Sequence, residues 1–484
     1  MSEIAKTNRA AVDLNTIREK YKAGSADGLM RLGTEVEQWL VNPANNQTPL
    51  RMMTPWQSQG IFRELASRKD SVVFSEKQGV RVPGIIDGRP LVCVDAGGIS
   101  YQLELCGVLE AATRPVELEK LPELFKLLDS ARTNLDALAN KAGLAIFDGA
   151  VLTSATVADC EANMVERERL QAEWGKFKAQ GPDAAGLRTM GLATSAQVSL
   201  SYRDAREADE IITLANYLSP LLIGAFDNSA RFVENRPTNK ISRAQWWLDH
   251  NKDAPRGGIP APILEAMESS ERYPGVLLDR WIDYIVDVPM VYYIDAEGNP
   301  RFDRSPTFRE LQAEGLGDQT NFALAESLCW PDVKIIGGQR IELRMCDSGP
   351  WQAEGLSAIA ATLLACPAGR EKTFRLLEET GIDPKTLMES RTAVCTQGLD
   401  ATFGNTTLRD LLPRLLDLVL EDAPRLGVPA STLKCLAVLR DTETSDAERL
   451  RQVPFANAAD ADAYLTRPVV LRSGDATVNA CAQS

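Results

Sequence analysis

Polar and apolar residues alternate along several short stretches, which predicts half-buried β-strands. The first covers residues 33–40, where Glu35 and Glu37 lie two positions apart with Val36 between them. Successive side chains of a strand point to opposite faces of the sheet, so both carboxylates are expected on one face and Val36 on the other. The same alternation recurs at residues 99–105, 194–202 and 339–347.

Helical periodicity dominates much of the remaining chain. Amphipathic helices are predicted at residues 59–68, 116–142 and 204–226, and the pattern is helical from residue 355 onward, with a leucine stripe at 406–420. Residues 80–94 are predicted to form a pair of strands, because Asp87-Gly88 is a common signal for a short hairpin turn.

Composition removes several classes of protein from consideration. No apolar run reaches the roughly 18 residues that a membrane-spanning helix needs, and the polar start of the chain lacks the apolar block of a signal peptide, so a cytoplasmic location is expected. Nine cysteines without paired C-x-x-C spacing and a single histidine argue against a structural zinc site or a disulfide scaffold. A formal net charge of -14 argues against extended nucleic-acid binding.

Carboxylates are therefore the candidate metal ligands. Glu35 and Glu37 repel each other when both are ionised side by side, unless a cation lies between them, and a divalent metal is the natural partner. Glu104 and Glu110, around the end of the 99–105 strand, would add two more carboxylates. An amphipathic strand with a solvated acidic face would show the same pattern, so both interpretations remain open at this point.

A polar segment at residues 227–256 gathers positive charge in this acidic chain and is predicted to be a loop. Local positive charge suits a polyphosphate, although a solvated loop whose tryptophans cap the core would look similar. No role is assigned to His250 within this segment. On the 339–347 strand, Arg340, Glu342 and Arg344 share one face, which fits either a binding site or a structural ion ladder.

In their order along the chain, these motifs resemble those of glutamate-cysteine ligases, closest to the type of plants and proteobacteria. The resemblance covers roughly residues 30 to 350, and an ordered series is more specific than any one motif. The matching segments are Gly33-Thr34-Glu35-Val36-Glu37, Leu103-Glu104-Leu105-Cys106-Gly107, Gln197-Val198-Ser199-Leu200, Arg243 with Trp247-Leu248-Asp249 and Lys252-Asp253, Asp283-Tyr284 with Asp287-Val288-Pro289-Met290, Thr307-Phe308-Arg309, and Ile341-Glu342-Leu343-Arg344.

The resemblance implies an α+β, glutamine-synthetase-like fold, in which a curved, largely antiparallel sheet forms a funnel covered by helices. It also implies ATP as co-substrate and two or three Mg²⁺ ions. In such enzymes the γ-carboxylate of glutamate attacks the γ-phosphoryl group of ATP, and the α-amine of cysteine captures the resulting acyl phosphate, as the first step of glutathione-type synthesis. Small molecules are the expected partners, with no nucleic acid and no membrane.

The resemblance extends to individual residues of the site. Arg243 and Arg344 match the phosphate-facing arginines, to which a catalytic role is given. The positions that match metal ligands are Glu35, Glu37, Glu104, Glu110, Gln197 and Glu342. Nucleotide or substrate binding is expected of Lys240, Trp247, Lys252, Arg256, Ser199 and Arg340.

Departures from the family pattern lie near the expected substrates and leave the acceptor open. Ser199 stands where the family usually shows Asn, and the histidine often found before the last strand is absent near Ala325-Glu326. The segment between Glu104 and Glu110 is one residue shorter than in the plant form. A γ-glutamyl ligase acting on a different amine is therefore the alternative, and a non-catalytic relative that binds an amino acid or nucleotide is a third possibility.

No Gly/Ser linker, charge run or internal repeat marks a domain boundary. Residues 1–354 are therefore predicted to form the catalytic core, and residues 355–484 a helical part of the same domain.

Overall fold

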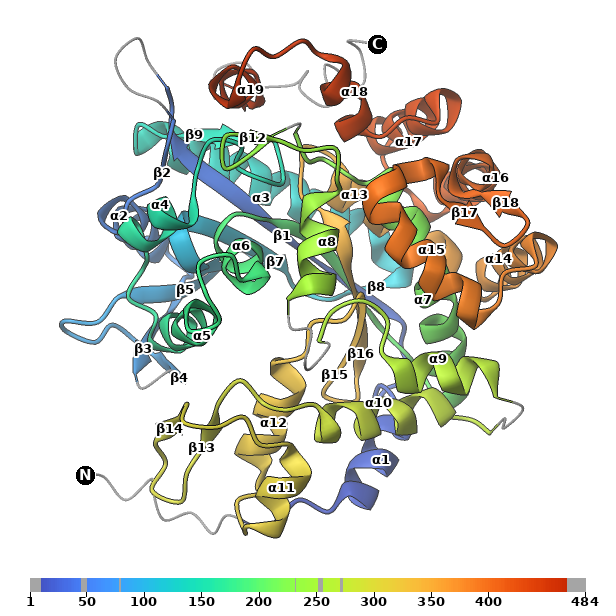
Figure 1. Ribbon diagram of the computed structural model, residues 1–484, viewed down its shortest axis with the longest axis horizontal. Coiled ribbons are helices and arrows are strands. Elements are labelled where there is room, and N and C mark those ends of the chain that lie inside the picture. The colour runs from blue at the N-terminus through green and yellow to red at the C-terminus, as the bar shows by residue number, and fades with distance from the viewer. Residues whose placement is uncertain are drawn as a thin grey trace.

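The computed structural model describes residues 10–44, 50–77, 80–230, 232–250, 256–269 and 273–467. A 13-stranded antiparallel sheet crosses the centre of this part of the chain (Figure 1). Its main path runs, in spatial order, through β15 (Val333–Ile336), β16 (Arg340–Asp347), β10 (Ser195–Ser201), β1 (Arg31–Asn42), β7 (Val108–Thr113), β6 (Ile99–Leu103), β5 (Leu91–Ala96), β3 (Val72–Lys77) and β4 (Val80–Pro83). Beside this path, β2 (Arg51–Met52), β8 (Val116–Glu117) and β9 (Ala145–Phe147) pair with β1, and β19 (Thr466–Arg467) pairs with β9.

The two faces of the sheet differ as the alternation predicts. Leu32, Val198 and Leu343, on three neighbouring strands, belong to one buried apolar cluster. Further along, Leu109 and Tyr101 belong to a second such cluster, against which Val36 packs. The intervening positions of these strands carry the polar side chains. Burial of the apolar face therefore also fixes which residues point to the polar face.

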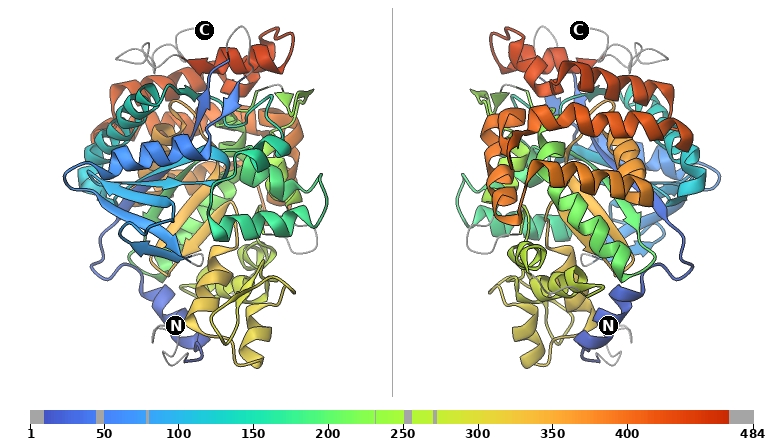
Figure 2. Two further views of the ribbon diagram at one scale, coloured as in Figure 1. Left: turned by 90° about the vertical axis from the view of Figure 1, so that its left-hand side faces the viewer. Right: turned by 90° about the vertical axis from the view of Figure 1, so that its right-hand side faces the viewer.

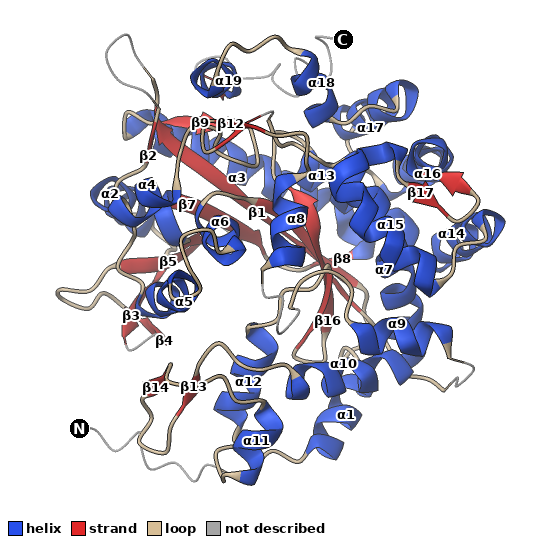
Figure 3. Cartoon of the chain, in the orientation of Figure 1, coloured by secondary structure: helices blue, strands red, loops and turns tan. Residues whose placement is uncertain are grey.

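Helices surround the sheet, and short hairpins join some of them (Figure 3). The helices are α1 (Leu14–Ala23), α2 (Pro55–Ala66), α3 (Leu121–Lys141), α4 (Val157–Ala162), α5 (Glu168–Lys178), α6 (Ala185–Gly191), α7 (Ala205–Ala225), α8 (Ser242–Asp249), α9 (Ala261–Glu268), α10 (Val276–Asp287), α11 (Phe308–Ala313), α12 (Gln319–Ser327), α13 (Gln352–Ile359), α14 (Pro367–Thr380), α15 (Pro384–Gln397), α16 (Leu408–Asp422), α17 (Ala430–Thr442), α18 (Asp446–Gln452) and α19 (Ala458–Leu465). The hairpins are β11 (Phe232–Val233) with β12 (Arg236–Pro237), β13 (Tyr293–Ile294) with β14 (Pro300–Arg301), and β17 (Thr402–Phe403) with β18 (Thr406–Thr407).

The covering helices lie in different places around the sheet. Buried residues of α3, α7 and α13 join the apolar cluster under β1, β10 and β16. Figure 1 shows α6 and α8 in front of the sheet, while α10, α11 and α12 gather with α1 at one end of the molecule, as both views of Figure 2 also show. The expected α+β fold, a large antiparallel sheet covered by helices, is confirmed.

Two local predictions are wrong. Strands β4 and β5 do not pair with each other, because β3 lies between them: Phe74 is opposite Pro83 on one side and Cys93 on the other. The Asp87-Gly88 turn therefore belongs to a connection that crosses β3. The segment predicted as a loop at 227–256 contains the helix α8, which packs against α6 and α15.

The C-terminal helices contact the sheet directly. The Thr34 hydroxyl on β1 is 2.8 Å from that of Ser357 on α13, and Trp351 Nε1 donates to Asp446 at 2.8 Å. Their assignment to the same domain as the catalytic core remains a prediction. Within the described residues, no helix combines the length and apolar character needed to cross a bilayer.

A buried ion pair ties α15 to the strand that carries Arg344. Arg391 on α15 binds the carboxylate of Asp332 with two nitrogens, Nη2 at 3.0 Å, and both side chains are almost fully buried. The backbone carbonyl of Asp332 in turn accepts a hydrogen bond from the amide of Arg344 at 2.9 Å.

We therefore expect Arg391→Met to lower the free energy of unfolding by about 3–5 kcal/mol, because it leaves a buried carboxylate without its charged partner. Denaturant unfolding measures the change. The double variant Arg391→Met/Asp332→Asn should recover part of the loss. A single variant as stable as the wild type would contradict this role of the pair.

Candidate active site

The polar face of the sheet brings together a row of carboxylate and amide side chains. In the strand register, Glu35 on β1 is opposite Gln197 on β10, and Glu37 is opposite Glu110 on β7. Directly opposite residues share a face, with Cβ atoms about 5 Å apart. Alternation within β1 places Glu35 and Glu37 on this same face. Carboxylate and amide side chains from three neighbouring strands therefore share it.

The row continues onto β16. Ser199 on β10 is opposite Glu342, and its hydroxyl donates to Glu342 Oε1 at 3.3 Å. Arg344, two positions along β16, forms an ion pair with Glu342. Glu342 is only 1% exposed, so this guanidinium is its main compensating charge inside the protein.

Hydrogen bonds hold the first carboxylate pair in place. Glu37 Oε2 accepts from the backbone amide of Ser195 at 2.6 Å and from its hydroxyl at 2.9 Å. Gln197 Nε2 lies 3.4 Å from Glu37 Oε1. Gln197 is buried, and its side-chain oxygen has no hydrogen-bond partner in the described part of the protein. A buried amide group is therefore left next to a half-buried carboxylate.

The carboxylates on β1 and β7 are electrostatically unbalanced. Burial, together with the charge of Glu342, raises the pKa of Glu35 to about 7. Burial also raises the pKa of Glu37, and burial with the Glu35 charge holds the pKa of Glu110 well above its usual range. For Glu342, burial is outweighed by the charges of Arg344 and Lys334, so its pKa is lowered. Glu35, Glu37 and Glu110 therefore require protons or a bound cation to balance their charge, whereas Glu342 already has positive neighbours.

The donor set on this face fits Mg²⁺. Carboxylate and amide oxygens are the hard ligands that this ion binds. A bound Mg²⁺ would supply the partner that the buried Gln197 oxygen lacks. In the chain as described, no three His, Cys, Asp or Glu side chains already surround one point closely enough to hold a metal ion. The metal-binding role of Glu35, Glu37, Glu104, Glu110, Gln197 and Glu342 therefore remains a prediction.

The position of Arg243 follows from a bulge in the sheet. The register between β10 and β16 shifts around Gln197, where two residues of β16, Arg344 and Met345, face one of β10. Such a bulge leaves backbone groups without strand partners. Arg243, buried on α8, donates to the carbonyl oxygens of Arg344 at 2.8 Å and Met345 at 3.1 Å. The structure thus joins the two predicted arginines, with Arg243 bound to the backbone of β16.

Glu104 is held by a residue that the sequence did not single out. Arg167, buried before α5, places Nη1 3.1 Å from Glu104 Oε1 and Nε 3.2 Å from Glu76 Oε2. Between Glu104 and Glu110 the chain makes a short turn, in which Cys106 adopts a left-handed conformation (φ 60°). Arg167 is 63 residues from Glu104 and matches no motif, so no sequence signal connected the two.

The predicted nucleotide- and substrate-binding residues are spread more widely. Ser199 lies in the row described above, whereas Lys240 and Arg340 are exposed. Arg256 is buried, and its Nη1 donates to the carbonyl of Leu328 at 2.7 Å. Trp247 packs against His250 and Trp330, and Lys252 lies outside the described residues. Their binding roles remain predictions.

His250, the only histidine, is buried in an aromatic cluster. Its ring centroid lies 4.4 Å from that of Phe177, 4.9 Å from Trp247 and 5.2 Å from Trp330. Its Nδ1 is 2.9 Å from the Thr189 hydroxyl. Burial, assisted by the charge of Arg256, lowers the pKa of His250 to about 3. The imidazole is therefore neutral in the folded protein at ordinary pH.

This pKa predicts a loss of stability in mild acid. Below the unfolded value of 6.5 the unfolded chain binds a proton that the folded chain refuses, so the free energy of unfolding falls by up to about 1.4 kcal/mol per pH unit, roughly 2 kcal/mol at pH 5. Between pH 8 and pH 5 we expect the free energy of unfolding to fall by about 2 kcal/mol more in the wild type than in His250→Phe. Denaturant unfolding at the two pH values measures this difference. Parallel pH profiles for the two proteins would contradict the assignment.

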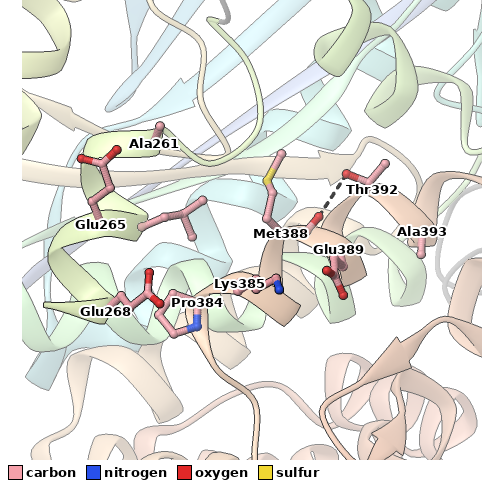
Figure 4. Close-up of a pocket in the computed structure, with 10 residues that line it drawn as sticks. Ala261, Glu265, Glu268, Pro384, Lys385, Met388, Glu389, Thr392 and Ala393 are labelled. Atoms are coloured by element: carbon pink, nitrogen blue, oxygen red, sulfur yellow. Dashed lines mark hydrogen bonds between the residues drawn. The ribbon is translucent and has the colours of Figure 1, made fainter.

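Two surface hollows lie apart from the acidic row. One, of about 730 Å³, is formed by α9 and α15 and is lined by Ala261, Leu264, Glu265, Glu268, Pro384, Lys385, Met388, Glu389, Thr392 and Ala393 (Figure 4). The other, of about 550 Å³, lies beside α3 and the β5–β6 turn and includes Arg68, Asp70 and Asp129. Neither contains a predicted site residue, so the candidate site is defined by the polar face of the sheet.

Comparisons with curated protein sequences and with solved structures give no assignment. No curated protein sequence matches the chain significantly. Among solved structures, the complex between the prokaryotic ubiquitin-like protein Pup and its ligase PafA gives a TM-score of 0.32 at 11% identity, covering 89% of this chain and 68% of that chain. A bifunctional glutathione synthetase from Pasteurella multocida gives 0.35 at 12% identity, covering 93% and 53%. Similarities this weak do not assign a function.

The family comparison is decisive. A family model of glutamate-cysteine ligase family 2 (GCS2) matches residues 31–402, which span the strands and helices that carry the acidic row, Arg243 and Arg344. This match covers well over half of the chain. The chain therefore belongs to glutamate-cysteine ligase family 2.

Proposed function

We propose that this protein is an ATP-dependent ligase that joins the γ-carboxylate of glutamate to the α-amine of cysteine through a γ-glutamyl phosphate. Membership in the family supports an ATP-dependent carboxylate-amine ligase. The observation that carries the proposal is the partly buried acidic row on β1, β7, β10 and β16, in which Arg344 pairs with Glu342 and Arg243 binds the backbone of β16. Such an arrangement of anions beside guanidiniums suits a phosphoryl-transfer site.

In this proposal the protein positions reactants and balances charge. The γ-carboxylate of glutamate attacks the terminal phosphorus and ADP leaves. The amine then attacks the acyl carbon, phosphate leaves, and the amine loses a proton. Arg344 has a guanidinium fork that matches phosphate oxygens, and Arg243 holds the bulged backbone of β16 that presents it.

Mg²⁺ would be held by the carboxylates of the row and by the Gln197 oxygen, and when bound it supplies neutralisation of phosphate charge. Ser195 fixes the orientation of Glu37, and Arg167 fixes that of Glu104. Glu35 and Glu37 need no covalent role, since the nucleophiles in both steps belong to the substrates.

A ligase that uses a different acceptor amine is the second candidate. It is favoured by Ser199, which replaces the usual family Asn and whose hydroxyl hydrogen-bonds Glu342 in the row itself. A side chain that differs at this position changes the polar contacts available to a substrate.

The test is ADP release by the purified protein with ATP, Mg²⁺ and glutamate, with cysteine and then a panel of other amines, and with the product identified by mass. Stimulation by cysteine with a γ-glutamylcysteine product is the expected result. Stimulation by another amine alone would keep the ligase chemistry and change the acceptor. ATP binding without ADP formation across the whole panel would contradict catalysis and favour a non-catalytic relative.

A further inference from the structure

Lys334 is a buried cation on the site face of the sheet to which neither the family resemblance nor the preceding mechanism gives a role. It lies on β15, directly opposite Glu342 in the strand register, and is 6% exposed. Its neighbours Val333 and Ile335 belong to the apolar cluster on the other face. Alternation therefore directs Lys334 to the face that carries Glu342 and Arg344.

The ammonium group of Lys334 is only partly committed. Nζ donates to the carbonyl of Ser327, near the end of α12, at 3.0 Å. Among the described residues no ion pair joins Lys334 to a carboxylate within 4.0 Å. A lysine ammonium has three donors, so two remain for other groups. A lysine this deeply buried is unusual, which points to a function for this charge at this place.

Arg344 explains why a second cation is needed. In this structure Arg344 is paired with Glu342. The proposed function requires Arg344 to contact the transferred phosphoryl group, and it cannot keep its full pairing with Glu342 while doing so. Once Arg344 turns away, Glu342 loses its ion-pair partner, and Lys334, directly opposite it across the strand pair, is the buried protein cation that can balance its charge beside any Mg²⁺ that the row holds.

We propose that Lys334 is a positioning residue that compensates the charge of Glu342 and thereby frees Arg344 to bind the nucleotide phosphate. The inference rests on the proposed function. Arg344 then has two positions, one on Glu342 without nucleotide and one on phosphate with nucleotide. Lys334 makes the second position accessible without itself touching the substrate.

The test compares nucleotide binding in matched variants. Calorimetry with Mg²⁺ and a non-hydrolysable ATP analogue should give a dissociation constant at least about tenfold higher for Lys334→Met, because Arg344 is then retained by Glu342. Lys334→Arg, which keeps the charge, should remain within about threefold of the wild type. Lys141→Met, at an exposed lysine paired with Glu64, is the control and should bind as the wild type does. Equal binding by Lys334→Met and the wild type would overturn the inference.

A structural readout keeps the proposal testable if Lys334→Met does not fold. In the wild-type complex with the ATP analogue, Arg344 should contact phosphate oxygens, and Lys334 Nζ should lie within about 4 Å of the Glu342 carboxylate. An intact Arg344–Glu342 pair in that complex would overturn it. Failure of the wild type to bind the analogue would instead reject the proposed function, whereas an unexpected acceptor amine affects neither measurement.

Discussion

Glu37→Gln is expected to abolish Mg²⁺-dependent ADP formation while the fold remains intact. Glu37 lies at the centre of the acidic row, opposite Glu110 and next to the unpartnered oxygen of Gln197. A neutral amide can still accept the hydrogen bonds from Ser195 but supplies no charge to a divalent cation. Loss of a metal contribution of several kcal/mol corresponds to at least about a 100-fold fall in kcat.

Steady-state ADP release across a range of Mg²⁺ concentrations measures this effect, with circular dichroism to verify the fold. Glu117→Gln is a suitable control, because Glu117 lies on β8 and pairs with Lys120 near the surface. Near-normal turnover of Glu37→Gln would refute the metal assignment. Stimulation that returns only at high Mg²⁺ would support it, since the remaining ligands would then bind the ion weakly.

Arg344→Lys should also reduce turnover strongly, by about 100-fold or more in kcat/KM for ATP. Lysine keeps the positive charge beside Glu342 but replaces a planar fork by a single point of donation. The pairing with Glu342 is therefore largely retained, and the variant tests phosphate recognition rather than local charge.

The distinguishing measurement is the full set of kinetic constants for ATP, glutamate and the acceptor amine. Arg375→Lys, at an exposed arginine paired with Glu371, should behave as the wild type and controls for the substitution itself. A change confined to the KM for glutamate would show that Arg344 does not act on the phosphate.

Local patterns in the sequence predicted the parts of the site that depend on strand geometry. Two-residue spacing alone placed Glu35 and Glu37 on one face of β1, and Glu342 and Arg344 on one face of β16. Helical periodicity predicted α7 and α16 close to their observed bounds, whereas α3 begins later than predicted because Val116–Glu117 pairs with β1 as strand β8. These predictions succeeded because burial of one face fixes which residues point to the other.

Features that depend on pairing between distant segments could not be predicted in this way. The insertion of β3 between β4 and β5 is set by long-range strand pairing, which an Asp-Gly turn does not report. The link between Arg167 and Glu104, and the binding of Arg243 at the bulge opposite Gln197, likewise join residues far apart in the chain. The short helix α8 was missed because it has only eight residues within a polar, positively charged stretch, and its contacts with α6 and α15 join segments far apart in the chain.

The fate of the γ-carboxylate oxygen of glutamate tests the central claim most directly. Glutamate labelled with heavy oxygen in that carboxylate is incubated with ATP, Mg²⁺ and the amine that stimulates ADP release, and the inorganic phosphate is examined by mass spectrometry. If the reaction passes through a γ-glutamyl phosphate, each phosphate released retains one labelled oxygen, because the amine displaces phosphate from the acyl carbon. Unlabelled phosphate formed together with the amide product would contradict the account.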